Sequence, residues 1–179
     1  MMRANFSGLV HNGRADLPVI GEGIEPDKEA QLGSAITITA GRLLQDSDKF
    51  GAIVGEGVAS ALNLHAGDYI TLMANTLNGA LNTLECEIVG IFRTFSKEYD
   101  DRAIHIHLLA AQELLDTESV HGTIVLLDNT DKTDQVISKI AAALASQNYE
   151  IKAWWELADF YQKTEALYRR QFGALQVII

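Results

Sequence analysis

The sequence predicts an α+β fold with a strand-rich middle and a βαβ-like end. In residues 50–115, short runs of alternating apolar residues indicate strands, and only two short helical stretches interrupt them. Residues 123–154 contain an apolar run, a helical stripe and a second apolar run, which is typical of a strand–helix–strand unit. With 179 residues, the chain is long enough for one domain or two small ones with a buried core.

Composition and charge exclude several classes of function. The net charge is −10 and no basic stripe is visible, so the surface repels nucleic-acid phosphates and anionic lipid head groups. Cys86 is the only cysteine, which excludes an internal disulfide and a four-thiolate zinc site, and we expect it to be a small core residue. The sequence shows no signal peptide and no run of about 18 apolar residues that could span a membrane.

The chain begins with a predicted hairpin. Residues 6–10 and 16–23 alternate, and residues 11–14 between them contain the Asn-Gly pair that is typical of tight hairpin turns. Pro26 suits the first position of a short helix or turn. Residues 35–39 favour extended structure because they are rich in β-branched side chains.

The later elements follow from the same patterns of apolar spacing. Polar residues at 128–131 cap the predicted helix at 132–147, whose apolar side chains fall on one stripe. In chain order, we expect strands at residues 51–54, 69–74, 84–92, 103–108, 123–127 and 149–154, and helices at residues 56–64, 109–115, 132–147 and from 157 to the end.

One glycine-rich turn raises the question of nucleotide binding. Gly55 and Gly57 follow the strand at 51–54 and open a helix, which is the spacing of a dinucleotide fingerprint. A true fingerprint also needs a parallel strand that ends in an acidic residue about 20 residues later, and here a turn at Gly67-Asp68 leads into an antiparallel-looking strand. We therefore expect the glycines to allow a tight strand-to-helix turn, with a soluble nucleotide-binding enzyme as the alternative.

Histidine and acidic clusters do not amount to a catalytic or metal site. His105 and His107 face the same side of a strand, but zinc needs a third and usually a fourth ligand. Asp128, Asp131 and Asp134 lack the central glycine and closing glutamate of a calcium loop. Because no Ser-His-Asp, Cys-His or phosphate-loop arrangement is present, we expect no catalytic residue, no cofactor and no metal.

Five motifs occur in order along the chain. Residues 52–72 read AIVGEGVASALNLHAGDYITL, preceded by GIEPD at 23–27 and ITAGR at 38–42. CEIVGIFRT at 86–94 and KEYD at 97–100 follow. In this order they resemble the extracytoplasmic domain of MacB/FtsX-type ABC transporter permeases, and the last motif resembles the lipoprotein-releasing branch. Between the last two motifs the sequence departs from the family, because Phe95 stands where glycine is frequent.

The resemblance implies an ectodomain of two lobes. A porter-like lobe of mixed βα units would comprise residues 1–40 and 118–156, and a strand-rich lobe of residues 41–117 would be inserted between them. Residues 157–179 would form a stalk helix that leads to a membrane span. The family domain starts with further βα elements, so we expect part of the native ectodomain to precede this chain. The increasingly apolar end predicts either a chain that continues into a hydrophobic segment or a terminal helix docked on its own core.

The resemblance also implies a function. The domain would be non-catalytic and would lie on the extracytoplasmic (periplasmic) side of the cell membrane. A separate ATP-binding subunit would hydrolyse ATP, and mechanotransmission through the membrane helices would drive export or lipoprotein release. The implied partners are a second permease copy or homologue and a periplasmic partner or lipoprotein substrate, with no nucleic acid. A cell-division-type permease domain that activates a cell-wall hydrolase is the alternative within the family.

Three groups of residues are the expected functional positions. The turns that shape the fold are Gly55, Gly57, Gly67 and Asp68. The exposed loop expected to contact a partner or substrate contains Lys97, Glu98, Tyr99 and Asp100. The aromatic and apolar group expected to pack in the core, and to couple the porter-like lobe to the stalk, contains Trp154, Trp155, Phe160 and Tyr161.

Overall fold

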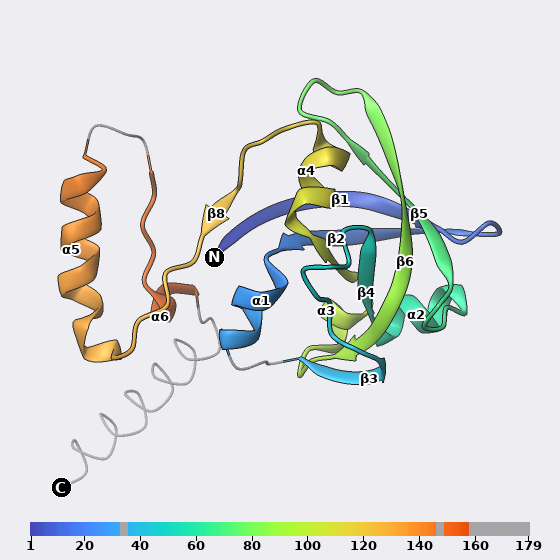
Figure 1. Cartoon of the computed structure of the whole chain (residues 1–179), viewed down its shortest axis with the longest axis horizontal. Helices are drawn as coiled ribbons and strands as arrows, with labels where there is room; N and C mark the ends of the chain where they lie inside the picture. The colour runs from blue at the N-terminus through green and yellow to red at the C-terminus, as the bar shows by residue number, and fades with distance from the viewer. Residues whose placement is uncertain (33–35, 146–148, 158–179) are drawn as a thin grey trace, which may run out of the picture. The chain divides into compact units, whose positions relative to one another are not determined.

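The computed structural model describes residues 1–32, 36–145 and 149–157 of the chain. The chain forms two compact units, Met1–Val125 and Leu126–Ile179, and Figure 1 labels most of their helices and strands. Strands and helices occur together in the first unit, which confirms the predicted α+β class.

The first unit holds all eight strands of the described residues and four of their α-helices. The strands are β1 (Met2–His11), β2 (Asp16–Ile24), β3 (Thr37–Gly41), β4 (Gly51–Gly55), β5 (Tyr69–Asn75), β6 (Leu81–Arg93), β7 (Ala103–His107) and β8 (Gly122–Thr123). The helices are α1 (Pro26–Glu29), followed by the 3₁₀ turn η1 (Ala30–Leu32), then α2 (Glu56–Leu62), α3 (Lys97–Asp100) and α4 (Leu108–Leu115).

Six strands of this unit form a closed ring. They pair in the order β2–β7–β4–β6–β5–β1, and β1 pairs back with β2 from Ala4↔Gly23 to His11↔Asp16. The β2–β7 and β4–β6 pairs are parallel, and the other pairs of the ring are antiparallel. Closure leaves the six strands no free edge, so each has hydrogen-bonded neighbours on both sides. β3 extends the sheet from β6, and β8 pairs with the first residues of β1.

The predicted hairpin of residues 6–10 and 16–23 is confirmed as β1 and β2. Gly13 takes a φ of +86° in its turn, a conformation that glycine adopts without strain. Both strands belong to the ring with β5 and β7, whereas the sequence grouped residues 1–40 with residues 118–156. The hairpin signal is local, so it could not show with which distant strands the hairpin would pair.

Strands β4 and β7 are buried on both faces, which explains their continuous apolar sequence. Ala52, Val54 and Ile104 belong to a core built by side chains from all six ring strands and from α2 and α4. The alternate residues Ile53 and Ala103 belong to a second, smaller core on the opposite face of the same strands. The ring is therefore packed inside and partly covered outside.

The second unit contains the remaining described elements, which are the 3₁₀ turn η2 (Thr130–Lys132), α5 (Thr133–Ala143) and α6 (Trp154–Leu157). The Asn129 side chain accepts a hydrogen bond from the Asp131 N–H at 2.8 Å, as expected of a polar cap. The predicted apolar stripe of α5 is only half-buried at Val136, Ile137 and Ile140.

Two predicted strands are wrong. Of residues 123–127 only Thr123 lies in a strand, and Val125 and Leu126 are 56% and 53% exposed. Residues 149–153 are irregular, and α6 begins at Trp154. A short apolar run shows that a segment can be buried, but it cannot show that a partner strand exists. The predicted long helix lies outside the described residues after Leu157.

None of the helices in residues 1–32, 36–145 and 149–157 has the length and apolar character needed to cross a membrane.

Candidate functional site

The turn between β4 and α2 is packed against α3 and the residue that follows it. A side chain at Gly55 would overlap the backbone carbonyl of Asp100, and one at Gly57 would overlap Asp101. Both glycines therefore serve the close approach of two backbone segments, since glycine alone has no Cβ to clash.

The structure contradicts nucleotide binding at this turn. The space beside Gly55 and Gly57, where a pyrophosphate would have to lie, is filled by Asp100 and Asp101. The carboxylate of Asp101 would also repel a phosphate. In addition, the strand that follows α2 is β5, which pairs with β1 and β6 and not with β4, so no βαβ unit is formed.

The turn at Gly67-Asp68 leads into β5. Gly67 has a φ of +94°, and its N–H donates to the carbonyl of Ile88 at 2.8 Å. The Asp68 carboxylate accepts from the N–H of His65 at 2.7 Å, and the Asp68 carbonyl accepts from the N–H of Ile88 at 2.8 Å. Backbone hydrogen bonds of Gly67 and Asp68 to Ile88 therefore attach the turn to β6.

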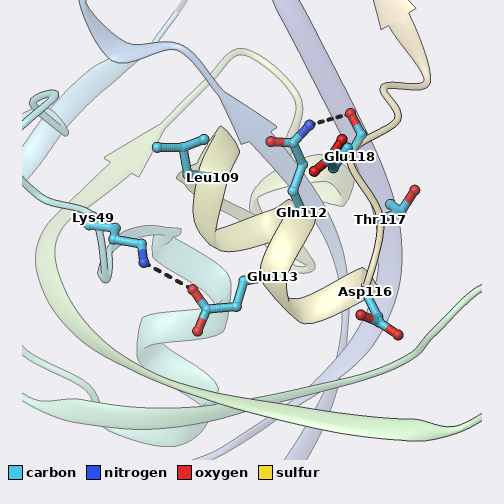
Figure 2. Close-up of a pocket in the computed structure, with 7 residues that line it drawn as sticks. All are labelled: Lys49, Leu109, Gln112, Glu113, Asp116, Thr117 and Glu118. Carbon is cyan, nitrogen blue, oxygen red and sulfur yellow. Dashed lines mark hydrogen bonds and ion pairs between the residues drawn. The ribbon is translucent and has the colours of Figure 1, made fainter.

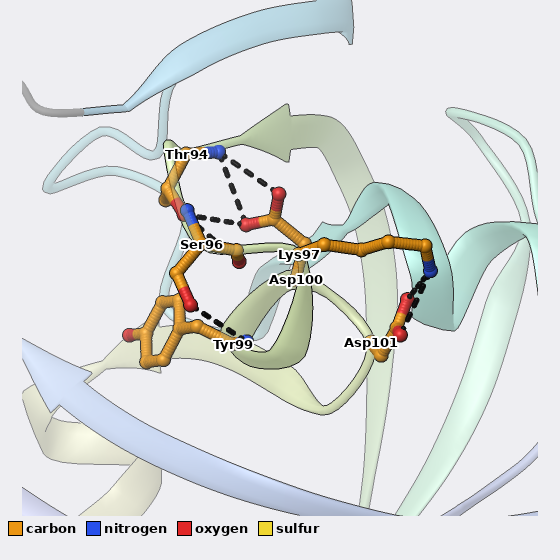
Figure 3. Close-up of polar contacts among 6 residues, drawn as sticks. All are labelled: Thr94, Ser96, Lys97, Tyr99, Asp100 and Asp101. Carbon is orange, nitrogen blue, oxygen red and sulfur yellow. Dashed lines mark hydrogen bonds and ion pairs between the residues drawn. The ribbon is translucent and has the colours of Figure 1, made fainter.

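The loop between β6 and β7 is held in one shape by its own side chains (Figure 3). The Asp100 carboxylate accepts from the Thr94 N–H at 3.0 and 3.1 Å and from the Thr94 hydroxyl at 2.8 Å. Ser96 caps α3, since its hydroxyl oxygen accepts from the Tyr99 N–H at 3.4 Å. Lys97 forms an ion pair with Asp101 at 2.8 Å.

The four residues predicted to form a contact loop divide into two kinds. Lys97 and Glu98 are exposed, whereas Asp100 is only 5% exposed and Tyr99 is half-buried. The expectation of a fully exposed loop is therefore wrong for Tyr99 and Asp100, because both are used to fix the loop. Phe95 is the residue that the sequence prediction missed, and it is 90% exposed.

Tyr99 connects this loop to a buried histidine on β7. The Tyr99 hydroxyl lies 2.7 Å from Nε2 of His105, and the His105 ring lies 5.0 Å from the ring of Phe92. Burial lowers the pKa of His105 to about 4, and the charge of Arg3 adds to this shift. Burial also raises the pKa of the Tyr99 hydroxyl, with Glu22 as the next cause. Both rings are therefore neutral at neutral pH.

A network of charged residues lies at the start of β1. Arg3 donates to Glu22 on β2 at 2.9 Å and to Glu29 on α1. The network links the helix after β2 back to the ring. Glu22 is the register partner of His105, so its side chain shares a face of the sheet with the histidine. No local pattern in the sequence marks this network, because Glu22 and Glu29 lie 19 and 26 residues from Arg3 along the chain.

The predicted histidine pair does not act as a unit. His105 is 4% exposed and bonded to Tyr99, whereas the Nδ1 of His107 accepts from the N–H of Leu109 and caps α4. Among the described residues, no group of three or more His, Cys, Asp or Glu side chains is arranged to hold a metal ion. Cys86 is fully buried, and burial raises the pKa of its thiol to about 12, which makes it unreactive.

An open depression lies beside α4 (Figure 2). Lys49 and Glu113 face each other across it at 3.1 Å, and the Gln112 side chain donates to the carbonyl of Glu118 at 2.7 Å. Because Lys49, Glu113 and Gln112 are engaged in these contacts and the depression is open, we assign it no ligand. Its lining residues are Lys49, Leu109, Gln112, Glu113, Asp116, Thr117 and Glu118.

The predicted coupling aromatics are described only in part. Trp154 and Trp155 lie in α6, and their rings meet edge to face with centroids 5.6 Å apart. Trp154 is 47% exposed and Trp155 is half-buried. Phe160 and Tyr161 lie outside the described residues.

The comparisons with known proteins agree with the resemblance found in the sequence. In fold, the chain is similar to the crystal structure of the extracellular domain of the noncanonic ABC-type transporter YknZ from Gram-positive bacteria. The TM-score is 0.63 at 14% identity, and the match covers 81% of this chain and 73% of that one. At this identity the likeness shows the fold alone.

The family match covers most of the chain. Residues 2–143 match the MacB-like periplasmic core domain. Membership implies an ATP-binding subunit as a partner of the whole transporter, and it points to a transporter component rather than an enzyme. The chain therefore belongs to the family of MacB-like periplasmic core domains, the extracytoplasmic domains of membrane-embedded ABC transporter permeases.

Proposed function

We propose that this domain is moved by ATP hydrolysis in the cytoplasm and that its movement drives export or lipoprotein release outside the membrane. The observation that carries the proposal is the family match over residues 2–143. The ATP-binding subunit would act through the membrane helices, and a second permease copy or homologue would supply the other half of the machine. The movement of the domain would act on a periplasmic partner or a lipoprotein.

The closed ring of the first unit supports a mechanical role. A packed interior deforms little under load, so a displacement applied at one end of such a barrel reaches the other end. Both faces of β4 and β7 are buried, which resists bending of these strands. A rigid domain of this kind is better suited to transmitting force than to adapting its surface to a ligand.

The second unit is the proposed point of coupling. We assign it to the porter-like lobe that would adjoin the stalk helix, with Trp154 and Trp155 as coupling side chains. Phe160 and Tyr161 remain part of this proposal. The half-buried stripe of α5 supports it, because such a helix can shift its packing at a smaller cost than a core strand can.

Spin labels on the reconstituted permease test the proposal without knowledge of the cargo. Asn78 lies in the exposed turn between β5 and β6, and Lys139 is exposed on α5, so cysteines at these positions carry one label in each unit. The buried Cys86 does not compete for the label. We expect the distance distribution to differ between nucleotide-free and vanadate-trapped permease, measured with excess unlabelled permease to dilute contacts between copies.

A label pair within the barrel is the control. Asn78→Cys with Glu98→Cys places both labels on exposed sites of the first unit, and its distances should stay the same in both nucleotide states. Identical distributions for the first pair in both states, with ATP hydrolysis intact, would contradict the proposed coupling.

A further inference from the structure

The sequence contains two Asn-Gly pairs, and the structure places their asparagines in different surroundings. Both pairs lie in hairpin turns, Asn12-Gly13 between β1 and β2 and Asn78-Gly79 between β5 and β6. The two glycines adopt similar left-handed conformations, with φ values of +86° and +81°. A Cβ on either glycine would meet no atom within 4 Å, so both turns have open space there. The two pairs therefore differ mainly in what holds the asparagine side chain.

The Asn12 side chain is fixed by hydrogen bonds at both ends of its amide. Its Nδ2 donates to the carbonyl of Leu62 at 2.7 Å, which joins the turn to the last residue of α2. Its Oδ1 accepts from the N–H groups of Arg14 and Ala15 at 3.0 and 2.9 Å. The side chain is also half-buried. The amide can change its orientation only when these bonds break.

The Asn78 side chain has no such constraint. It is exposed, and among the described residues no hydrogen bond or ion pair involves its amide. The turn itself is held by backbone bonds, from the Gly79 N–H to the carbonyl of Thr76 at 2.9 Å and from the Thr76 N–H to the carbonyl of Ala80 at 2.8 Å. Such bonds at an exposed loop tip open at a low free energy. The side-chain amide of Asn78 can therefore approach the backbone nitrogen of Gly79.

We propose that Asn78 is a site of spontaneous deamidation in the folded domain, whereas Asn12 is protected. The deprotonated backbone nitrogen of Gly79 attacks Cγ of Asn78, a C–N bond forms, and the former amide nitrogen leaves as ammonia. Water then opens the cyclic imide at either of its carbonyls, which leaves aspartate or isoaspartate at this position. Glycine favours the first step because it has no Cβ to hinder the approach of its nitrogen to the preceding side chain. The reaction consumes only water.

The modification changes the character of the turn between β5 and β6. No charged side chain occurs in residues 69–84, so the new carboxylate is the only charge in this part of the hairpin. It directly follows Leu77 in the sequence, and Leu77 and Leu81 are each 68% exposed. Isoaspartate also inserts an extra methylene into the backbone between the paired residues Asn75 and Leu81. The turn thus becomes more polar as the protein ages, and this inference does not depend on the proposed function.

Timed incubation of the purified full-length permease tests the proposal. One sample is kept folded and one is kept in urea, both in mildly alkaline buffer, and mass spectrometry of tryptic peptides follows aspartate and isoaspartate formation at each asparagine. In urea both Asn-Gly pairs should react at similar rates, because the folded surroundings are gone. In the folded permease Asn78 should react at close to that rate. Asn12 should react at least about tenfold more slowly, because its hydrogen bonds must break first.

Asn78→Gln is the matched control, because a glutamine side chain forms the corresponding larger imide far more slowly. It should remove isoaspartate from the tryptic peptide of residues 50–93 and leave the peptide of residues 4–14 unchanged. The proposal is overturned if Asn78 reacts in urea but is as slow as Asn12 in the folded permease, which would show that the bond of Gly79 to Thr76 protects the turn. It is also overturned if both asparagines react equally fast in the folded permease, or if Asn78→Gln leaves the isoaspartate in place.

Discussion

The barrel and the second unit differ in how completely they bury their apolar residues. In the first unit, every ring strand contributes to a core, and residues such as Ile88, Phe92 and Ile106 are fully buried. In the second unit, Thr133 and Ala153 are the only buried positions among the described residues. The burial of apolar side chains therefore stabilises the first unit far more than the described part of the second.

This difference indicates where movement can occur in the chain. A region with few buried contacts opens locally at a low free energy, whereas a closed and packed ring opens only when the whole unit unfolds. The proposed function would use both properties, since the barrel would be displaced without deformation while the second unit rearranges.

The largest expected effect comes from two phenylalanines of opposite exposure. Phe92 is fully buried in the second core, so Phe92→Ala should lower the free energy of unfolding by about 3–5 kcal/mol. Phe95 is 90% exposed, and Phe95→Ala should change it by no more than about 0.5 kcal/mol. Urea unfolding of both variants measures the difference. Equal losses of unfolding free energy in the two variants would mean that the Phe95 side chain is packed against other residues.

The buried histidine should make the barrel sensitive to acid. Burial lowers the pKa of His105 in the folded state from 6.5 to about 4, so the unfolded chain binds a proton first as the pH falls. The stability contributed by the neutral ring is complete above pH 6.5 and is lost between there and pH 4. At about 1.4 kcal/mol for each pKa unit, the loss is about 3 kcal/mol.

His105→Gln checks this pH dependence. The variant removes the titrating group, so its free energy of unfolding should vary less with pH between 6.5 and 4 than that of the unchanged chain. Parallel curves for the two proteins would show that the histidine is accessible to protons in the folded state.

A smaller effect is expected where the loop meets the β4–α2 turn. Gly55→Ala should cost about 1–3 kcal/mol, because its Cβ would overlap the carbonyl of Asp100 and force two backbone segments apart. Gly122→Ala is the control, because no atom lies within 4 Å of a Cβ at that position. Thermal unfolding compares the two. A neutral Gly55→Ala would show that the loop can withdraw from the turn.

The sequence predicted most elements of the barrel because each had a local signal. The Asn-Gly turn marked the first hairpin, and alternating apolar residues marked β5 and β6. The closure of the ring had no such signal, since it depends on pairs such as β2–β7 that are distant in the chain. The predicted strands at 123–127 and 149–154 failed for the same reason, because nothing local shows that a partner strand is absent.

The candidate site was predictable only in outline. The KEYD motif located the loop, but the burial of Asp100 depends on its bonds to Thr94, and that of Tyr99 on its contact with His105. Phe95 was visible as a departure from a family pattern without any indication of its exposure. Charged networks such as that of Arg3, Glu22 and Glu29 join three separate segments, so spacing along the chain cannot reveal them.

Hydrogen exchange, followed peptide by peptide, tests the contrast between the units most directly. We predict that amides of β4 and β6 exchange only through unfolding of the whole barrel, with protection that corresponds to its full free energy of unfolding. Amides of α5 should exchange far sooner, through local opening. Protection of α5 equal to that of β4, or rapid exchange within β4, would contradict a rigid barrel joined to a unit that yields.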